Sequence, residues 1–422
     1  MEHTGHTEQT WTYIDLFAGA GGLSEGFAEC GFRPLAHVEM NAHACNTLKT
    51  RACWRWLRQN GNLDLYREYL KGRISRDALY NAVPKDILDA VICEEMSDET
   101  MPGIFQKIDS AMKRAEANHV DMIVGGPPCQ AYSLVGRGRK DMSGDPRNHL
   151  YRQYLRALEC YRPEVFVFEN VPGLKTAGKG AYLQSIQSSV EALGYELEYH
   201  IQNASDYGVL QKRKRIILVG WRKGSGFHYP KLKKHKACAT VGALLGDLPP
   251  LEPGEEKREY ASQMPPAYLE GSGIRTADDI LTWHVARRHI DRDREIYRIA
   301  IRKWFDDHEH LAYGELPPEL RTHANASAFT DRFKVVERDD STCHTMVAHI
   351  AKDGHYYIHP DIEQARSISV REAARIQSFP DNFFFEGPRT AVFMQIGNAV
   401  PPMLARAIAA TIREQFEERE RQ

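Results

Sequence analysis

The residue of this chain best placed for covalent chemistry is Cys129. It belongs to the run Gly-Gly-Pro-Pro-Cys-Gln at residues 125–130, directly after the apolar run Val-Asp-Met-Ile-Val at residues 120–124. Prolines fix their own φ angles and lack N–H groups, so we expect the thiol on a stiff turn that leaves a buried strand. Ligands of open α/β sheets bind just outside the carboxyl ends of such strands. Most isolated intracellular cysteines are packing residues, but this turn favours a reactive thiol.

A carboxylate follows a second apolar run. Glu169 comes directly after Val-Phe-Val-Phe at residues 165–168 and precedes Asn170. A thiol with an ordinary pKa of about 8.5 is mostly protonated at neutral pH and needs an activated partner to react. A carboxylic acid at a neighbouring strand end can protonate a ring nitrogen and turn the ring into an electrophile. The competing interpretation of Glu169 is a helix-capping or salt-bridged carboxylate.

Two arginines belong to the run Gln-Lys-Arg-Lys-Arg at residues 211–215, which leads into an apolar segment. Strand alternation would send Arg213 and Arg215 to the same face. Two guanidinium groups on one face could hold a phosphate or a pyrimidine carbonyl. The competing interpretation is a solvated, charged edge strand.

A glycine-rich turn follows the first apolar run, in the sequence Asp-Leu-Phe-Ala-Gly-Ala-Gly-Gly-Leu at residues 15–23. Its glycines, Gly19, Gly21 and Gly22, allow a backbone to approach a ligand closely. Glu39 follows about twenty residues later, where an acid suits ribose hydroxyls, and Phe17 could stack on an adenine. The pattern alone does not separate a dinucleotide from S-adenosylmethionine.

The apolar runs predict the fold. We expect strands at residues 13–17, 121–124, 165–168 and 215–219, with a further strand at 35–38, and helices at 24–29, 151–161 and 182–193. Strands alternating with helices favour an α/β class: a doubly wound, mainly parallel, Rossmann-like sheet with helices on both faces. Residues 52–118 are polar and helix-favouring, so we expect a helical insertion without a clear strand.

Composition divides the chain into three parts. We expect a catalytic and cofactor domain at residues 1–220, a target-recognition domain at 221–368, and a closing segment at 369–422 that returns to the catalytic domain. Within the second part, residues 278–308 favour a helix, and residues 332–337 and 356–359 favour strands. Residues 395–402 are expected to turn into a helix that begins with prolines.

The 422 residues carry a net charge of −2, so overall charge does not indicate a polyanion partner. Residues 211–236, however, contain ten Lys or Arg and no Asp or Glu. The eight cysteines show no paired spacing, so neither a metal site nor a disulfide framework is expected. Residues 1–12 are polar and lack the apolar run of a signal peptide, and no apolar stretch approaches membrane-spanning length, so we expect a soluble cytoplasmic protein with no membrane partner.

Taken together, these residues resemble those of bacterial DNA (cytosine-5)-methyltransferases of the restriction-modification type. The resemblance extends over nearly the whole chain, and the motifs occur in the family's order. The matching segments are the glycine-rich loop at 15–22, Pro-Cys-Gln at 128–130, Glu-Asn-Val at 169–171, Gln-x-Arg-x-Arg at 211–215, Arg-Glu-Ala-Ala-Arg with Gln-Ser-Phe-Pro at 371–380, and Gly-Asn-Ala-Val-Pro at 397–401.

The resemblance implies a mechanism. The Cys129 thiolate would add to C6 of a cytosine, and Glu169 would bind N3 and the exocyclic amine. Arg213 and Arg215 would hold O2 and steady the covalent intermediate or the surroundings of the cysteine. The C5 atom would then accept a methyl group from S-adenosylmethionine, leaving S-adenosylhomocysteine. Because a stacked base is out of reach, the target would be flipped out of the duplex. The cofactor contacts that the resemblance implies, besides the three loop glycines, are Phe17, Glu39, Met40, Pro128, Leu150 and Asn398.

Two departures from the family pattern affect the cofactor site. Met40 stands where many members have a bulky aromatic residue, so adenine packing there would be looser. The stretch between Glu39 and Cys129 is longer than usual, which obscures the acid that normally binds the adenine amine, and Glu94 is the candidate.

The resemblance also implies partners. The substrate would be double-stranded DNA, bound by a monomer, and a cognate restriction endonuclease acting on the same site would be a partner unless the enzyme works alone as an orphan methylase. Phosphate contacts need basic residues, and base reading needs side chains that reach the groove. The residues expected to contact DNA are Gln130, Ser133, Lys231, Lys233 and Lys234.

Three alternatives are set against this interpretation. The tRNA-modifying branch of the same superfamily shares the cysteine and glutamate motifs but has a much reduced second lobe. A catalytically dead scaffold would not need an intact nucleophile, acid, arginine pair and cofactor loop, and cofactor binding would separate it. A dinucleotide oxidoreductase explains neither Cys129 nor the arginines.

Overall fold

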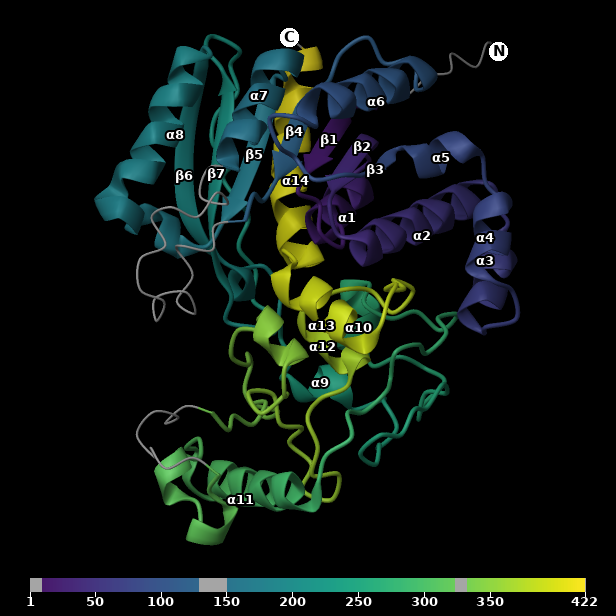
Figure 1. Ribbon diagram of the computed structural model, residues 1–422, viewed down its shortest axis with the longest axis vertical. Coiled ribbons are helices and arrows are strands. Elements are labelled where there is room, and N and C mark those ends of the chain that lie inside the picture. Colours follow the sequence, from purple (N-terminus) through teal and green to yellow (C-terminus); the bar gives the residue numbers. More distant parts are fainter. Residues whose placement is uncertain (1–9, 129–149, 323–331, 422) are drawn as a thin grey trace.

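A single mixed sheet forms the core of the upper part of the molecule (Figure 1). The computed structural model describes residues 10–128, 150–322 and 332–421. Within them, seven strands pair in the order β3-β2-β1-β4-β5-β7-β6. The strands are β1 (Thr12–Leu16), β2 (Arg33–Glu39), β3 (Val91–Cys93), β4 (Met122–Gly125), β5 (Val165–Asn170), β6 (Tyr195–Asn203) and β7 (Lys214–Arg222).

The first five strands pair in parallel, and β7 pairs antiparallel with both β5 and β6. The predicted α/β class and mainly parallel sheet are therefore confirmed. The chain runs outward from β1 to β2 and β3, then returns to β4 on the other side of β1. This reversal of strand order is the topological switch point, and ligands of open α/β sheets bind at the carboxyl ends of the strands there.

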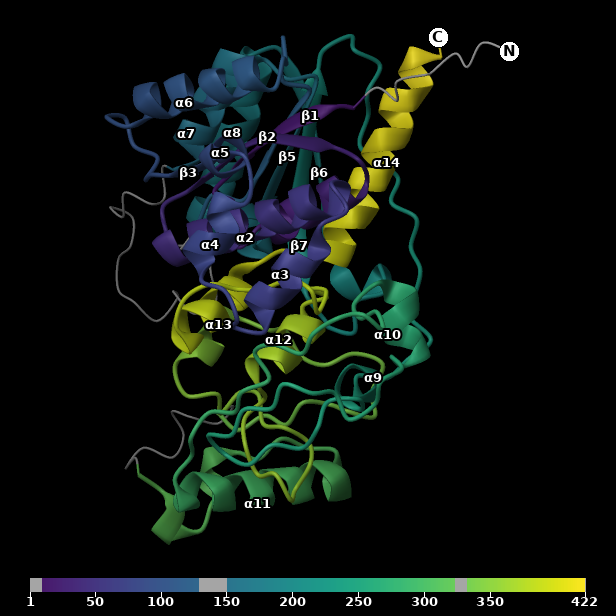
Figure 2. The ribbon, with the colours of Figure 1, turned by 90° about the vertical axis from the view of Figure 1, so that its right-hand side faces the viewer.

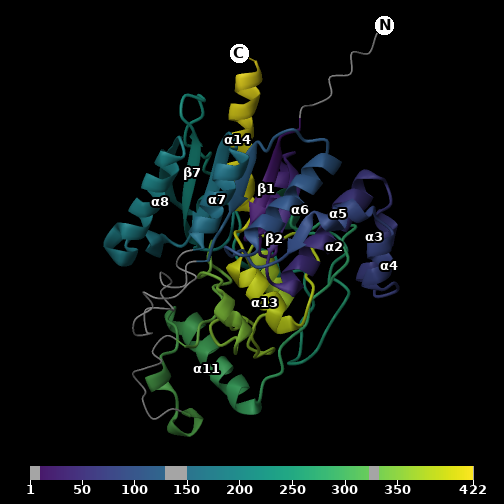
Figure 3. The same ribbon diagram turned by 45° about the horizontal axis from the view of Figure 1, so that its top comes forward.

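Alternation of apolar side chains along the strands builds a core on each face of the sheet. Tyr13, Met122 and Val167 belong to one buried cluster, whereas Ile14, Ile123 and Phe166 belong to another. The second face carries the helices α6 (Met101–Arg114), α7 (Tyr151–Tyr161) and α8 (Ala181–Ala192), and the first carries α1 (Gly22–Glu29) and α14 (Pro402–Glu420). Figure 3 shows α7 and α8 in front of the strands and α14 behind them.

The stretch from residue 52 to residue 118 is only partly an insertion. Helices α2 (Ala42–Gln59), α3 (Leu63–Leu70), α4 (Arg76–Asn81) and α5 (Lys85–Asp89) lie beside the sheet, as expected. The expectation of no strand is wrong, because β3 pairs with β2 and α6 then leads back to β4. A strand of three residues is too short to produce a hydrophobic period, so the sequence pattern does not reveal it.

The lower part of the molecule contains few regular elements in the described residues. Helix α11 (Asp291–Asp307) begins later than the predicted residue 278. The preceding backbone follows another path, with Trp283 at a φ of 62° and Val285 in a bridge to Glu256. The predicted strands at 332–337 and 356–359 are reduced to isolated bridges, such as Val335 with Ile358. The remaining helices here are α9 (Gly242–Leu245) and α10 (Ala267–Ser272).

The closing segment returns to the sheet through α12 (Val370–Ile376), α13 (Arg389–Asn398) and α14. Pro401 and Pro402 begin α14, as the sequence predicts. Helices α1 and α14 approach closely, because a Cβ atom at Gly22 would lie 2.3 Å from the Val400 oxygen and one at Gly26 would lie 2.3 Å from the Arg406 nitrogen. Among the helices of the described ranges, none combines the length and apolar character needed to cross a membrane.

Candidate active site

The turn after β4 is held against the end of β5. A Cβ atom at Gly126 would lie 2.8 Å from Oε2 of Glu169, so only glycine leaves room for this carboxylate. Asn170 donates from Nδ2 to the Pro127 carbonyl oxygen over 3.0 Å. Glu169 therefore faces the turn that leads into Cys129. The thiol itself, together with Gln130 and Ser133, lies outside the described residues.

Glu169 is paired with Arg215 of β7. Nε of Arg215 lies 2.7 Å from Oε1 of Glu169, and the two side chains are only 11% and 12% exposed. Burial raises the pKa of Glu169, although the charge of Arg215 acts in the opposite direction. Burial likewise lowers the pKa of Arg215. A shielded carboxyl group with a raised pKa is suited to giving a proton to a ring nitrogen.

Arg213 has a different environment from Arg215. Its fully buried guanidinium donates to the main-chain oxygens of Met346, Gly397 (3.0 Å) and Ala399 (2.8 Å). These contacts place Arg213 between the segment before α12 and the turn into α14. In the described residues Arg215 alone is ion-paired with Glu169. The clamp of both arginines on one base stays a prediction. Arg213 precedes the first residue of β7, so strand alternation does not relate its side chain to that of Arg215.

Gln211 completes this buried junction. Its Oε1 accepts from the Met346 N–H over 2.7 Å, and its Nε2 donates to Oε1 of Gln377 over 2.7 Å. Gln377 in turn donates to the Ile396 and Ala399 oxygens over 2.9 Å. Both glutamines belong to motifs noted in the sequence, but a positioning role for them was not anticipated.

The glycine-rich loop after β1 has the backbone of a ligand cradle. Phe17, Gly19 and Gly21 all have positive φ angles, of 57°, 56° and 85°. Oε2 of Glu39 accepts the Gly19 N–H, and its Oε1 accepts the Asn41 N–H, each over 2.8 Å. Glu39, at the end of β2, therefore holds the loop at the end of β1. Burial raises the pKa of Glu39, although these hydrogen bonds oppose the shift.

The other predicted cofactor contacts lie at the edges of the same region. Met40 directly follows β2 and is 62% exposed. Asn398 and Pro128 are exposed, and Leu150 is half-buried at the start of α7. The close approach of Gly22 to Val400 brings the segment of Asn398 beside the cofactor loop.

Glu94 follows β3, and its N–H donates to the main-chain oxygen of Glu39 over 2.9 Å. Its carboxylate Oε2 lies 2.5 Å from Nζ of Lys107. The position beside β2 agrees with an adenine contact, but the carboxylate of Glu94 is already paired with a lysine.

The lysines predicted to bind DNA phosphates lie on the segment that follows β7, and two of them form ion pairs. Lys233 pairs with Glu414 over 2.6 Å, and Lys234 pairs with Asp206 over 2.9 Å. Glu414 lies 12 residues beyond Pro402, which is about 18 Å along α14 from the end of this helix that lies beside the glycine-rich loop. In Figure 2 the segment that follows β7 descends beside α14, on the side of the sheet away from α6 and α7. Lys231 is exposed on the same segment.

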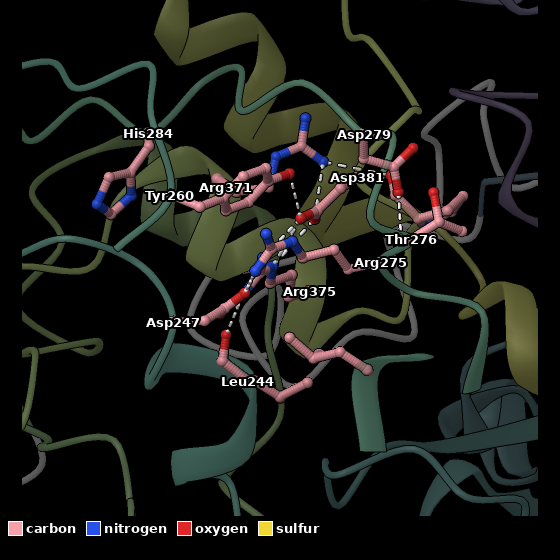
Figure 4. Close-up of polar contacts among 12 residues, drawn as sticks. Leu244, Asp247, Tyr260, Arg275, Thr276, Asp279, His284, Arg371, Arg375 and Asp381 are labelled. Atoms are coloured by element: carbon pink, nitrogen blue, oxygen red, sulfur yellow. Dashed lines mark hydrogen bonds and ion pairs between the residues drawn. The ribbon is translucent and has the colours of Figure 1, made fainter. Parts of the chain in front are cut away.

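A buried ionic network joins Asp247 and Arg275 to α12 (Figure 4). Arg375 pairs with Asp381 over 2.6 Å and with Asp247 over 2.5 Å, and Asp247 also pairs with Arg275. All four side chains are at most 2% exposed. Removing one partner from such a network leaves an uncompensated buried charge, so it strongly constrains how the two segments pack.

Comparison with known proteins identifies the family. A solved structure assigned as a DNA modification methyltransferase of an Escherichia coli prophage aligns over 97% of this chain and 100% of its own, with a TM-score of 0.62 and 23% identity. The Entamoeba histolytica methyltransferase EhMeth aligns over 97% and 99%, with a TM-score of 0.54 and 15% identity. At these identities the structures show the fold, which is that of a methyltransferase.

Sequence relatives extend this to the family. The family model of the C-5 cytosine-specific DNA methylases matches residues 11–84 and 94–414. The Type II methyltransferase M.Bpa9945I of Bacillus paralicheniformis is 43% identical, over 95% of this chain and 98% of its own. M1.HphI of Haemophilus parahaemolyticus is 30% identical, over 95% and 86%. The chain therefore belongs to the C-5 cytosine-specific DNA methylase family and is a DNA (cytosine-5-)-methyltransferase.

Proposed function

We propose that this enzyme transfers a methyl group from S-adenosylmethionine to C5 of one cytosine in a short, specific sequence of double-stranded DNA. The observation that carries the proposal is the Glu169–Arg215 pair, which faces the turn leading into Cys129. An acid and a guanidinium beside the turn that leads into Cys129 match the donors and acceptors of a cytosine ring.

The chain's own residues account for the steps on the base. The Cys129 thiolate forms a bond to C6 while Glu169 gives its proton to N3, so the ring becomes nucleophilic at C5. Arg215 donates to O2 and offsets the charge that develops there. S-adenosylmethionine supplies the methyl group that C5 accepts. Loss of the C5 proton to a base then expels Cys129 as a thiolate, and the proton on N3 returns to Glu169.

The glycine-rich loop and its neighbours fit the proposed cofactor. Positive φ angles at Gly19 and Gly21 turn the backbone around a compact ligand, and Glu39 stands at the end of β2 where ribose hydroxyls are bound in Rossmann-like folds. The ring of Phe17 and the exposed side chain of Met40 offer apolar surface to an adenine. These residues, with Pro128, Leu150 and Asn398, would hold S-adenosylmethionine.

The buried position of Glu169 requires the target base to leave the helix. A carboxylate only 12% exposed cannot reach N3 of a stacked, paired cytosine, so the nucleotide must be flipped out of the duplex. The duplex would lie between the sheet and the lower part of the molecule, which would read the sequence. One chain carries all these groups, so we propose that it acts as a monomer on DNA, either beside a cognate restriction endonuclease or as an orphan methylase.

The decisive experiment uses a bacterial host without cytosine methylation. The wild-type chain and Cys129→Ser are expressed, and host DNA is sequenced for 5-methylcytosine at base resolution. Modification at one short recurrent word, lost in the variant, is the expected result. Unmodified DNA in the presence of folded wild-type enzyme contradicts the proposed substrate, and tRNA from the same cells is then analysed. Methylation by Cys129→Ser at the wild-type level contradicts the covalent mechanism.

A further inference from the structure

Two histidines and a glutamate converge in the lower part of the molecule, away from the sites described above. His310, Glu337 and His344 each offer one ligand atom, and these three atoms lie within 4.8 Å of one another. Oε1 of Glu337 is 3.8 Å from Nε2 of His310, and Oε2 is 2.8 Å from Nδ1 of His344. Glu337 is 6% exposed, and in the described ranges neither lysine nor arginine forms an ion pair with it.

The hydrogen bonds of His344 indicate a cation. Its Nε2 lies 2.6 Å from the Tyr356 carbonyl oxygen, which can only accept, so Nε2 carries a proton. Its Nδ1 lies 2.8 Å from a carboxylate oxygen, which also only accepts. A neutral imidazole has a single N–H, so its Nδ1 lone pair would face the negative carboxylate. A metal ion between the two groups, or a second proton on the ring, removes this conflict.

The surroundings favour the metal ion. A histidine that binds a metal through one nitrogen commonly donates from the other to a main-chain carbonyl, as His344 does to Tyr356. Both rings are held by stacking: His310 on Trp304 with centroids 4.7 Å apart, and His344 on Tyr357 with centroids 5.1 Å apart. Such contacts fix ring orientation before a ligand arrives.

We infer that His310, Glu337 and His344 form a binding site for a divalent transition-metal ion, with zinc as the best match. Two imidazoles and one carboxylate are an established zinc ligand set. The ligand atoms of a tetrahedral zinc site, each about 2.0–2.2 Å from the metal, lie roughly 3.3–3.6 Å from one another. The three atoms here lie within 4.8 Å of one another, so binding one ion would require the side chains to move by about an ångström. The sequence indicated no metal site, because the three residues share no short spacing.

The site would join two parts of the chain. His310 follows α11, whereas Glu337 and His344 flank a turn whose end pairs with the segment just before β7. Beside His344, Cys343 donates its N–H to the Leu210 oxygen over 3.0 Å. A bound ion would therefore tether α11 to the entrance of β7 and raise the stability of the fold.

The test is a zinc titration of the tag-free, full-length chain after treatment with a chelator. We compare wild type with Glu337→Gln, His344→Gln and the partly exposed His310→Gln, and with His228→Gln as a matched control on an exposed histidine elsewhere. Calorimetry gives stoichiometry and affinity, and cobalt substituted for zinc gives an absorption spectrum that reports tetrahedral coordination. Melting curves recorded in chelator verify that each variant is folded.

Wild type and His228→Gln should bind one more zinc ion per chain than the three cluster variants, or bind it at least roughly tenfold more tightly. Zinc at about a hundred times its Kd should raise the Tm of wild type and leave the Tm of the cluster variants unchanged. Zinc held by the cysteines is common to every variant, so only the difference counts. Equal binding by wild type and Glu337→Gln, or none by wild type, overturns the inference and leaves an imidazolium–carboxylate pair. If a variant does not fold, zinc binding and tetrahedral coordination measured on the wild type alone decide whether the site exists.

Discussion

Arg215 and Glu169 form a shielded ion pair across two antiparallel strands, with Nε of the arginine 2.7 Å from Oε1 of the glutamate. Only one carboxylate oxygen is engaged by Arg215 in this way. The other faces Gly126, at the start of the turn that leads into Cys129. Arg215 thus holds the carboxyl group of Glu169 in place while one of its oxygens stays directed toward the turn that leads into Cys129.

Glu169→Gln should reduce kcat strongly and change cofactor affinity little. Glutamine keeps the shape of the side chain but cannot give a proton to N3, and loss of a general acid typically costs about 10²–10⁴-fold in rate. Single-turnover methylation and calorimetric binding of S-adenosylmethionine measure the two effects separately. If rate and cofactor affinity fell together, Glu169 would have a structural role instead.

The two arginines should respond differently to replacement by lysine. Arg215→Lys is expected to lower kcat by about 10- to 100-fold, the equivalent of one charge-assisted hydrogen bond, with little change in Tm. Arg213→Lys should lower Tm and raise the KM for the cofactor, because a lysine cannot replace all three hydrogen bonds and the Gly397 oxygen, next to Asn398, would lose its Arg213 donor. Each arginine is thus the control for the other. Identical profiles for the two variants would contradict the separate roles.

Gly26→Ala should destabilise the enzyme even though alanine is the better helix former. The intrinsic gain in a helix is about 1 kcal/mol, but the new Cβ atom would lie 2.3 Å from the Arg406 nitrogen of α14. Forcing the two helices apart is expected to cost about 1–3 kcal/mol beyond that gain. Gly103→Ala in α6 is the matched control, since nothing lies within 4 Å of its Cβ position. Urea unfolding should rank Gly103→Ala at or above wild type and Gly26→Ala below it.

Acid unfolding should depend on Glu25. Burial opposes its ionisation, but the charges of Arg51 and Arg55 outweigh burial and lower its pKa to about 2. Because the folded pKa lies below the unfolded value of 4.5, the carboxylate contributes stability that is present above pH 4.5 and is lost as the pH falls toward 2. The shift corresponds to about 3 kcal/mol.

Glu25→Gln tests this contribution at constant temperature. The variant should be less stable than wild type at pH 7, because the buried Arg51 and the half-buried Arg55 lose their partner, and the difference should shrink between pH 4.5 and 2. Glu29→Gln, whose carboxylate is 37% exposed, is the control. A difference between wild type and Glu25→Gln that does not depend on pH would assign the effect to packing.

Much of the site could be predicted from the sequence because it follows from local order. Strand-length apolar runs end at Phe17, Gly125 and Glu169, and in a parallel sheet such ends meet at one edge. The glycine-rich loop, Glu39 and Glu169 were therefore placed correctly without coordinates. Five of the seven strands in the described residues, all except β3 and β6, were predicted for the same reason, because alternation and helical periodicity depend on neighbouring residues.

The tertiary structure alone decided which side chains meet across long stretches of chain. The sequence predicts the same role for Arg213 and Arg215, yet Arg213 is buried against main-chain carbonyl groups more than a hundred residues away in the chain. Lys233 and Lys234, which the sequence predicts to contact DNA, form ion pairs with Glu414 and Asp206. Strand β3 is recognised only by its pairing with β2. The approach of His310 to Glu337 and His344 is another contact that the tertiary structure alone reveals. Periodicity specifies the face on which a side chain lies, but its partner depends on how distant elements pack.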